Sequence, residues 1–167
     1  EIADRYGITD KRAGSFSVGF SYDPGDWYVM GEAGYSNGKS LLTKSRGAYV
    51  SAGWRHGELT PYAVAAWTSA GDPTRIAGVP TAGPPARAAA TATLLNAGLN
   101  HYLGSVPVQS SVALGVRWDF MPNVALKLQA DHLRPKAGTR GTLINDQPGL
   151  RDGRSVNAAS AALDFVF

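Results

Sequence analysis

The chain has 167 residues, the length of one ordinary domain, and its 16 Lys and Arg against 13 Asp and Glu give a formal net charge of +3. Only 17% of the residues are charged, below the roughly 25% of a typical soluble domain, while glycine (20) and proline (10) are frequent. This composition excludes a disordered charged tail, and the lack of cysteine excludes a disulfide scaffold, a thiol nucleophile and a Cys-ligated metal site.

Apolar and polar residues alternate with a period of two along most of the chain, which predicts strands. In the first hairpin, two alternating segments flank the turn Asp23-Pro24-Gly25-Asp26, and Pro and Gly supply the backbone angles of a tight reversal. Two more hairpins follow, and a last alternating segment ends the sequence. The seven predicted strands span residues 14–23, 27–36, 48–55, 62–69, 112–120, 124–131 and 155–167.

The connections between the predicted strands alternate in length. Those at 23–26, 56–60 and 121–123 are short, whereas those near 36–46, 70–107 and 135–153 are long and rich in glycine, proline and charge. Within the longest connection, four large side chains have helical spacing and predict a short helix around 92–103. The four side chains are Leu95, Leu99, Tyr102 and Leu103.

Three features favour a transmembrane β-barrel over a soluble sandwich. The strands have about the ten residues that a tilted, membrane-spanning strand needs, and each carries one apolar face. Short turns on one side and long loops on the other are typical of outer-membrane barrels. Aromatic residues gather beside the short turns and at the C-terminus, where a membrane interface would hold them. The predicted membrane-interface aromatic residues are Tyr22, Trp27, Trp54, Tyr62, Trp118, Phe120 and Phe167.

The alternation also assigns residues to two faces. One face is predicted to contact lipid and includes Phe16, Val18, Phe20, Val50, Leu114, Val116, Leu126, Leu128, Leu163 and Phe165. The opposite face is small and polar, as a water-filled lumen requires. The predicted pore-lining residues are Glu32, Arg55, Arg117, Asp119, Lys127, Gln129, Asp131 and Asp164.

Several segments together resemble the C-terminal half of Gram-negative outer-membrane porins. They are SYDPGDWYVMGE at 21–32, GVRWDFMPNVALKLQ at 115–129, GTLINDQPG at 141–149 and the terminal ALDFVF at 162–167. The resemblance implies a large antiparallel barrel of roughly 16 strands in the bacterial outer membrane. It also implies a homotrimer that is surrounded by lipid and lipopolysaccharide and lets small hydrophilic solutes diffuse passively, with no cofactor and no nucleic-acid partner.

Complete bacterial barrels have an even number of strands, so seven strands leave two interpretations open. In the first, residues 1–167 are a partial barrel domain within a longer porin. In the second, residues 1–13 supply a poorly patterned eighth strand of a small barrel that acts as a surface adhesin or structural protein. A soluble β-sandwich binding module is a third alternative.

The sequence predicts no enzyme and no metal site. His56, His101 and His132 lack the spacing of metal ligands, and no nucleophile elbow, Walker loop or dinucleotide fingerprint is present. Asp131 and His132 are adjacent, so in a strand they point to opposite faces and form no dyad.

The long loops carry more cations than carboxylates. Arg134, Lys136 and Arg140 are predicted to lie in an outer vestibule that concentrates anions and gives a weak anion preference. Two other interpretations stay open, in which the loop cations bind lipopolysaccharide phosphates or are merely solvated. The 70–107 loop is predicted to constrict the pore, to cover its outer surface or to contact a neighbouring subunit.

Overall fold

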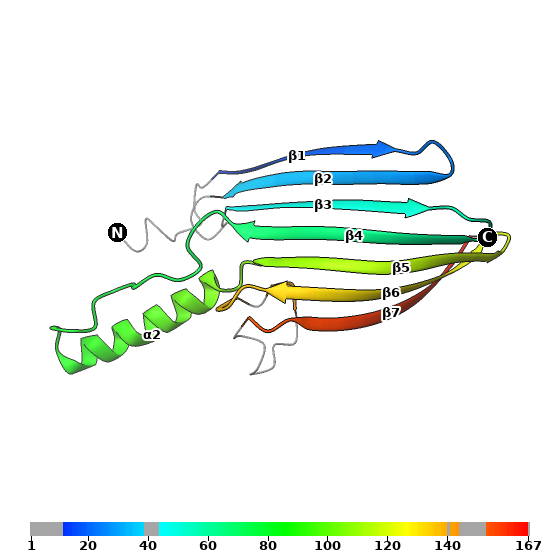
Figure 1. Cartoon of the computed structure of the whole chain (residues 1–167). Helices are drawn as coiled ribbons and strands as arrows, with labels where there is room; N and C mark the ends of the chain where they lie inside the picture. Colours follow the sequence, from blue (N-terminus) through cyan, green and yellow to red (C-terminus); the bar gives the residue numbers. More distant parts are fainter. Residues whose placement is uncertain (1–11, 39–43, 140, 144–152, 167) are drawn as a thin grey trace.

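A computed structural model of the chain describes residues 12–38, 44–139, 141–143 and 153–166. Seven strands lie side by side in one layer, and each is paired with its neighbours in the sequence (Figure 1). The strands are β1 (Ala13–Tyr22), β2 (Trp27–Gly38), β3 (Ser45–Trp54), β4 (Leu59–Ala70), β5 (Gln109–Met121), β6 (Val124–Pro135) and β7 (Val156–Phe165). The prediction of an all-β chain with seven antiparallel strands is confirmed.

The sheet is open. All six strand pairs are antiparallel and join consecutive strands, so β1 and β7 form the two edges of the sheet. The seven strands do not close into a barrel, because closure would require β7 to pair with β1 directly or through further strands. Both edge strands run toward the end of the sheet that carries the short turns (Figure 1).

Short turns connect the strands at one end of the sheet, here called the short-turn end, and the opposite end is called the long-connection end (Figure 1). In the turn between β5 and β6, Pro122 precedes Asn123, which has a positive φ of 63°. Proline fixes the first turn angle and asparagine tolerates the left-handed second one, so this pair suits a two-residue reversal. A register shift between Trp118 and Met121 precedes this turn.

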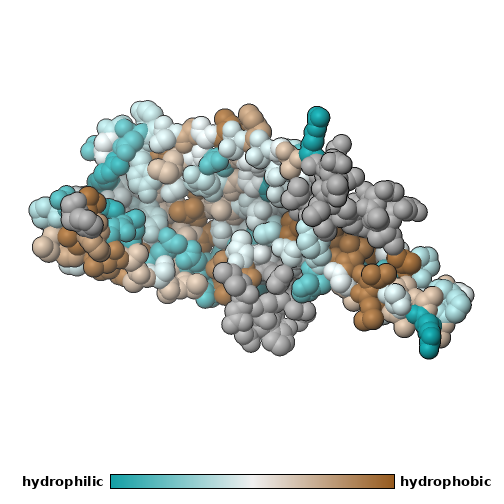
Figure 2. Space-filling view, turned by 180° about the vertical axis from the view of Figure 1, so that it is seen from behind, coloured by the Kyte–Doolittle hydropathy of each residue, from teal (hydrophilic) through white to brown (hydrophobic). Residues whose placement is uncertain are grey.

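The register places the predicted lipid-facing residues on a single face, here called the apolar face. For example, Phe20 lies opposite Gly31, which lies opposite Val50, and Leu126 lies opposite Leu163. The other face, here called the polar face, carries serines on β1 and charged residues on β5, β6 and β7. Figure 2 shows this polar face, where most of the sheet appears in the teal and pale shades that mark hydrophilic and intermediate residues.

No second layer covers the apolar face in the described part of the chain. Its large side chains are exposed, with Phe16 at 71%, Leu114 at 63% and Phe165 at 62% of their full accessible surface. The buried apolar residues of the described chain are Ala92, Leu103, Val106, Ala113 and Ala125, and none of them lies on this face. The described residues therefore form no hydrophobic core beneath the largest apolar surface of the sheet.

The connection between β4 and β5 contains the helix α2 (Ala86–Leu103), which extends beyond the long-connection end of the sheet (Figure 1). The predicted helix is confirmed, but it begins at residue 86 rather than near 92. Residues 86–93 contain five alanines, which favour a helix without giving any apolar periodicity. In the described part of the chain, no helix is long and apolar enough to cross a membrane.

Two asparagines of α2 attach the preceding segment, residues 76–79, to the helix. Asn100 accepts a hydrogen bond from the Ile76 amide at 2.8 Å and donates one to the Ile76 carbonyl at 3.0 Å. Asn96 forms the same pair of bonds with Val79, at 2.7 and 2.8 Å. The helix and this segment therefore form one unit.

Candidate functional site

Four charged side chains form a network on the polar face near the short-turn end. Arg117 of β5 forms an ion pair with Asp119 at 2.6 Å and contacts Asp164 of β7 at 3.4 Å. Lys127 of β6 lies between these strands and reaches Asp164 at 2.7 Å. Because Arg117 and Lys127 are direct cross-strand neighbours, Asp164 offsets two adjacent positive charges. Two cations and two carboxylates leave the network with no net charge.

A second group of polar side chains extends along the same face. The Tyr62 hydroxyl donates a hydrogen bond to Gln129 Oε1 at 2.9 Å, and Gln129 Nε2 donates one to Asp131 Oδ1 at 2.8 Å. Tyr62 lies directly opposite Gly115, and a side chain at that glycine would overlap the tyrosine ring. The absence of a side chain at Gly115 therefore allows the ring to lie across the sheet toward Gln129.

Arg55 connects two of the short turns. Its guanidinium donates to both carboxylate oxygens of Asp23, at 2.7 and 2.6 Å, and to the Gly25 carbonyl at 2.6 Å. The hydrogen bond from Arg55 holds the pKa of Asp23 below its ordinary value, and Asp23 in turn raises the pKa of Arg55. The guanidinium carbon also lies 5.5 Å from the centre of the Tyr28 ring, within cation–π range.

These groups surround a hollow of about 470 Å³ on the polar face. Five of the eight predicted pore-lining residues line it, namely Arg55, Arg117, Asp119, Lys127 and Gln129. Asp164 and Asp131 reach it through the ion pairs and hydrogen bond just described. Glu32 lies on the same face, opposite Gly19 and Tyr49, and is on the same strand as Tyr28, four residues toward the long-connection end. Their role in lining a pore stays a prediction.

The hollow also includes residues that sequence reasoning missed. Tyr28 and Thr60 line it beside Tyr62, and Ser51 forms part of its floor. Alternation in the predicted strands assigns Tyr28 and Ser51 to the polar face, whereas Thr60 falls in the predicted turn 56–60. Charge does not identify any of the three, because their side chains are uncharged.

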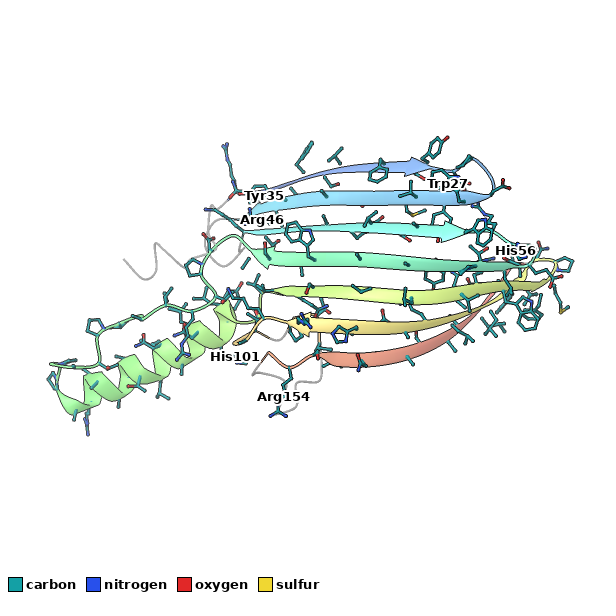
Figure 3. All side chains as sticks on the ribbon, viewed as in Figure 1. Trp27, Tyr35, Arg46, His56, His101 and Arg154 are labelled. Atoms are coloured by element: carbon teal, nitrogen blue, oxygen red, sulfur yellow. The ribbon has the colours of Figure 1, made fainter. Side chains whose placement is uncertain are left out.

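Aromatic rings form one close pair at each short turn. Ring centres are 5.3 Å apart for Tyr22 and Trp27 and 5.2 Å apart for Trp118 and Phe120. At the remaining short turn, Trp54 lies 5.4 Å from His56. Figure 3 shows Trp27 and His56 at this end of the sheet. These close ring pairs therefore all lie at the short-turn end of the sheet.

Two of the predicted interface aromatics need separate comment. The structure places Tyr62 on the polar face, where it contacts Gln129, and not with Trp27, Trp54 and Trp118. The position of Tyr62 beside a short turn predicts the membrane interface. In β4, however, side chains alternate between the faces, and Pro61 is on the apolar face while Tyr62 is on the polar face. Phe167 lies outside the described residues.

The structure describes two of the three predicted vestibule residues, Arg134 and Lys136. The structure places Arg134 inside β6, opposite Ser110 and on the apolar face, so its assignment to a loop vestibule is corrected. Arg134 follows Leu126, Leu128 and Ala130 at an even spacing along β6, and this alternation alone assigns all four residues to the same face. Lys136 follows β6 directly, and Arg140 lies outside the described residues.

The histidines do not form a metal centre. Among the described residues, no three His, Asp or Glu side chains are placed to hold a metal ion. His132 Nδ1 lies 2.7 Å from Asn157 Oδ1 on the apolar face, while His101 belongs to α2. The charged side chains at the short-turn end of the polar face form ion pairs with one another. No family model, curated protein or solved structure matches this chain.

Proposed function

We propose that this sheet forms part of an outer-membrane porin, whose polar face lines a water-filled channel for the passive diffusion of small hydrophilic solutes. In this proposal lipid and lipopolysaccharide surround the barrel, and the protein assembles as a homotrimer. The observation that carries the proposal is the exposed apolar face, which extends over all seven strands and is not covered by any other described residues.

An uncovered apolar face of this size is unusual for a protein in water. A soluble domain buries such a face against a second layer, and contiguous exposed apolar patches larger than a few hundred Å² are rare on soluble monomers. Here the exposed side chains include phenylalanines on both edge strands and leucines between them. Lipid chains would cover this surface, and the polar face would then contact water inside the barrel.

The height of the apolar face agrees with a membrane span. On β2, Tyr35 and Trp27 stand at its two ends, and Trp67 and Leu59 do so on β4. Each pair is separated by eight residues, which corresponds to about 27 Å along a strand. The apolar band of outer-membrane barrels is about 25 Å tall.

The direction of the edge strands limits how the barrel can close. Because β1 and β7 are parallel to each other, an all-antiparallel barrel needs an odd number of additional strands between them. Seven strands and an odd number of others give the even total found in bacterial outer-membrane barrels. We therefore propose that the barrel contains an odd number of strands in addition to the seven that the structure describes.

Conductance measurements test the proposal. The intact protein, purified in detergent and added to planar bilayers, should produce stable stepwise increases in ion current. Protein that inserts into the membrane without conducting would instead favour a plugged barrel with an adhesive or structural role. Release from cells without detergent would contradict a barrel of either kind and favour a soluble sandwich.

Spin-label accessibility provides an independent test of the two faces. A label at Leu126 or Leu128 should be quenched by oxygen, which partitions into lipid, and a label at Gln129 by a water-soluble nickel complex. Preferential quenching of Leu126 and Leu128 by the nickel complex would rule out a lipid-facing position.

A further inference from the structure

Two arginines stand on the apolar face at its long-connection end. Arg46 of β3 lies directly opposite Tyr35 of β2 and Ser69 of β4. Arg134 of β6 lies opposite Ser110, whose other cross-strand neighbour is Trp67. Figure 3 shows Tyr35 and Arg46 at this end of the sheet. These four residues, Tyr35, Arg46, Trp67 and Arg134, are here called the arginine–aromatic border.

The arginines of the border differ from the cations of the polar face. Arg55, Arg117 and Lys127 each form an ion pair with an aspartate. In the described part of the chain, no carboxylate lies within ion-pair distance of Arg46 or Arg134, and both side chains are exposed. Arg46 donates a hydrogen bond to the Ser69 hydroxyl at 3.1 Å, which leaves most of its N–H donors available.

The position of the border limits which partner can satisfy these donors. A charged guanidinium at the edge of a lipid-facing surface is stabilised by an anion at the level of the lipid headgroups. The positions of Tyr35 and Trp67 are consistent with the headgroup level, because amphipathic aromatic rings prefer the membrane–water interface. The planar fork of arginine also matches the oxygens of a phosphate group in a bidentate arrangement.

We infer that the arginine–aromatic border binds the phosphate groups of membrane lipids in the leaflet at the long-connection end, and this inference rests on the proposed barrel. In an outer membrane the ligand is a phosphorylated glycolipid of the outer leaflet. Three strand spacings separate β3 from β6, about 14 Å, so Arg46 and Arg134 each bind a separate phosphate.

Lipid binding by the intact protein in detergent micelles tests this inference. The probe is diphosphorylated lipid A, with the same lipid lacking its phosphates and inorganic phosphate as comparisons. Titration should show that wild-type protein binds the diphosphorylated lipid much more tightly than either comparison. The double variant R46Q/R134Q should bind it roughly 30-fold more weakly.

Matched variants separate this local effect from a general change of charge. R75Q/R87Q also removes two positive charges, from the connection that contains α2, and should leave the affinity for lipid A within about twofold. R46K/R134K keeps both charges and should retain most of the affinity. Raising the salt concentration should weaken binding by the wild type more than by R46Q/R134Q.

The outcomes distinguish the inference from the proposed function. If the protein conducts in bilayers but R46Q/R134Q binds lipid A as tightly as the wild type, the inference is wrong and the barrel proposal stands. Equal binding of the phosphorylated and dephosphorylated lipids would also overturn it. Equally tight binding of inorganic phosphate would assign the arginines to a soluble anion instead of a lipid. A protein that does not insert into bilayers would contradict the proposed function itself.

Discussion

At the scale of single residues, three aromatic rings lie across directly opposite glycines. Phe20 covers Gly31 on the apolar face, while Tyr28 covers Gly53 and Tyr62 covers Gly115 on the polar face. Glycine in a strand weakens it, because it has no side chain to pack and loses much conformational freedom. A ring from the neighbouring strand occupies the empty space and so restores packing at that position.

Replacement of Gly115 by alanine tests this arrangement. The new methyl group would overlap the Tyr62 ring, so the ring must move and its hydrogen bond to Gln129 is lost. We expect a loss of about 1–3 kcal/mol in the free energy of unfolding, measured by urea denaturation. Gly14→Ala is the control, because Gly14 has open space around its Cβ position and the change should be neutral or slightly stabilising. Equal stability of the two variants would contradict the packing role of the ring.

At the scale of elements, α2 is held to the preceding segment by side chains and not by a strand pairing. Asn96 and Asn100 each bond to both the amide and the carbonyl of one residue in that segment. They stand four residues apart and so lie on the same side of the helix. Ala92 and Leu103 on this side are buried, whereas Leu94 and Leu95 are exposed.

Asn100→Ala should remove the two hydrogen bonds between the helix and Ile76 and leave those to Val79 intact. We expect the Ile76 amide to exchange with solvent about ten- to a hundredfold faster, because a hydrogen bond of about 1–3 kcal/mol is lost, while the Val79 amide stays protected by Asn96. Asn96→Ala should give the reverse pattern. Hydrogen exchange measured by NMR distinguishes the two amides, and unchanged exchange in both variants would show that the bonds do not hold the segment.

The contact between Arg55 and Asp23 should depend on pH. Arg55 lowers the pKa of Asp23 in the folded protein, so the stabilisation is complete above the ordinary aspartate pKa of about 3.9. It decreases as the pH falls below that value and is lost once the lowered pKa is passed. The Arg55 amide is bonded to the Asp26 carbonyl at 2.7 Å, so its protection factor, the exchange rate corrected for the intrinsic effect of pH, should decrease in acid. Asp23→Asn should remove the acid dependence, whereas Asp26→Asn should preserve it.

The elements also show how far sequence patterns reach. Alternation in β3, from Ala48 through Val50 and Ala52 to Trp54, predicted the correct face because side chains alternate strictly along a strand. The same rule places Arg46 and Arg134 on the apolar face, but the predicted third strand begins too late to include Arg46 and the predicted sixth strand ends too early to include Arg134. Sequence patterns are least informative at strand ends, because a charged residue there suggests a loop while its place in the alternation assigns it to a face of the strand.

At the scale of the whole molecule, the closure of the sheet depends on contacts that no local pattern encodes. The period of the sequence predicts seven strands and two faces, and their odd number leaves a partial barrel as one of two interpretations, whereas the structure shows that the seven strands form an open sheet with β1 and β7 at its edges. The ion pairs of the polar face also join residues that are far apart in the sequence, such as Arg117 and Asp164. The residue types suggested mixed charge, but the pairing depends on the register of β5, β6 and β7.

The balanced network of Arg117, Lys127, Asp119 and Asp164 leads to a prediction about ion selectivity. If this face lines a channel, Asp164→Asn leaves one uncompensated positive charge, and Lys127→Gln leaves one negative charge. Charges in a confined wall act strongly on passing ions. In planar bilayers under a salt gradient, the reversal potential should therefore shift toward anion preference for Asp164→Asn and toward cation preference for Lys127→Gln.

Salt and position supply the controls for this prediction. Both shifts should be clear at about 0.01 M salt and nearly vanish at about 1 M, where the Debye length falls from about 30 Å to about 3 Å. Asp72→Asn removes the same charge as Asp164→Asn, but from a pair with Lys44 at 3.6 Å at the long-connection end, and it should shift the potential less. Shifts of the same sign in Asp164→Asn and Lys127→Gln, or no shift in either conducting variant, would show that this network does not face the permeating ions.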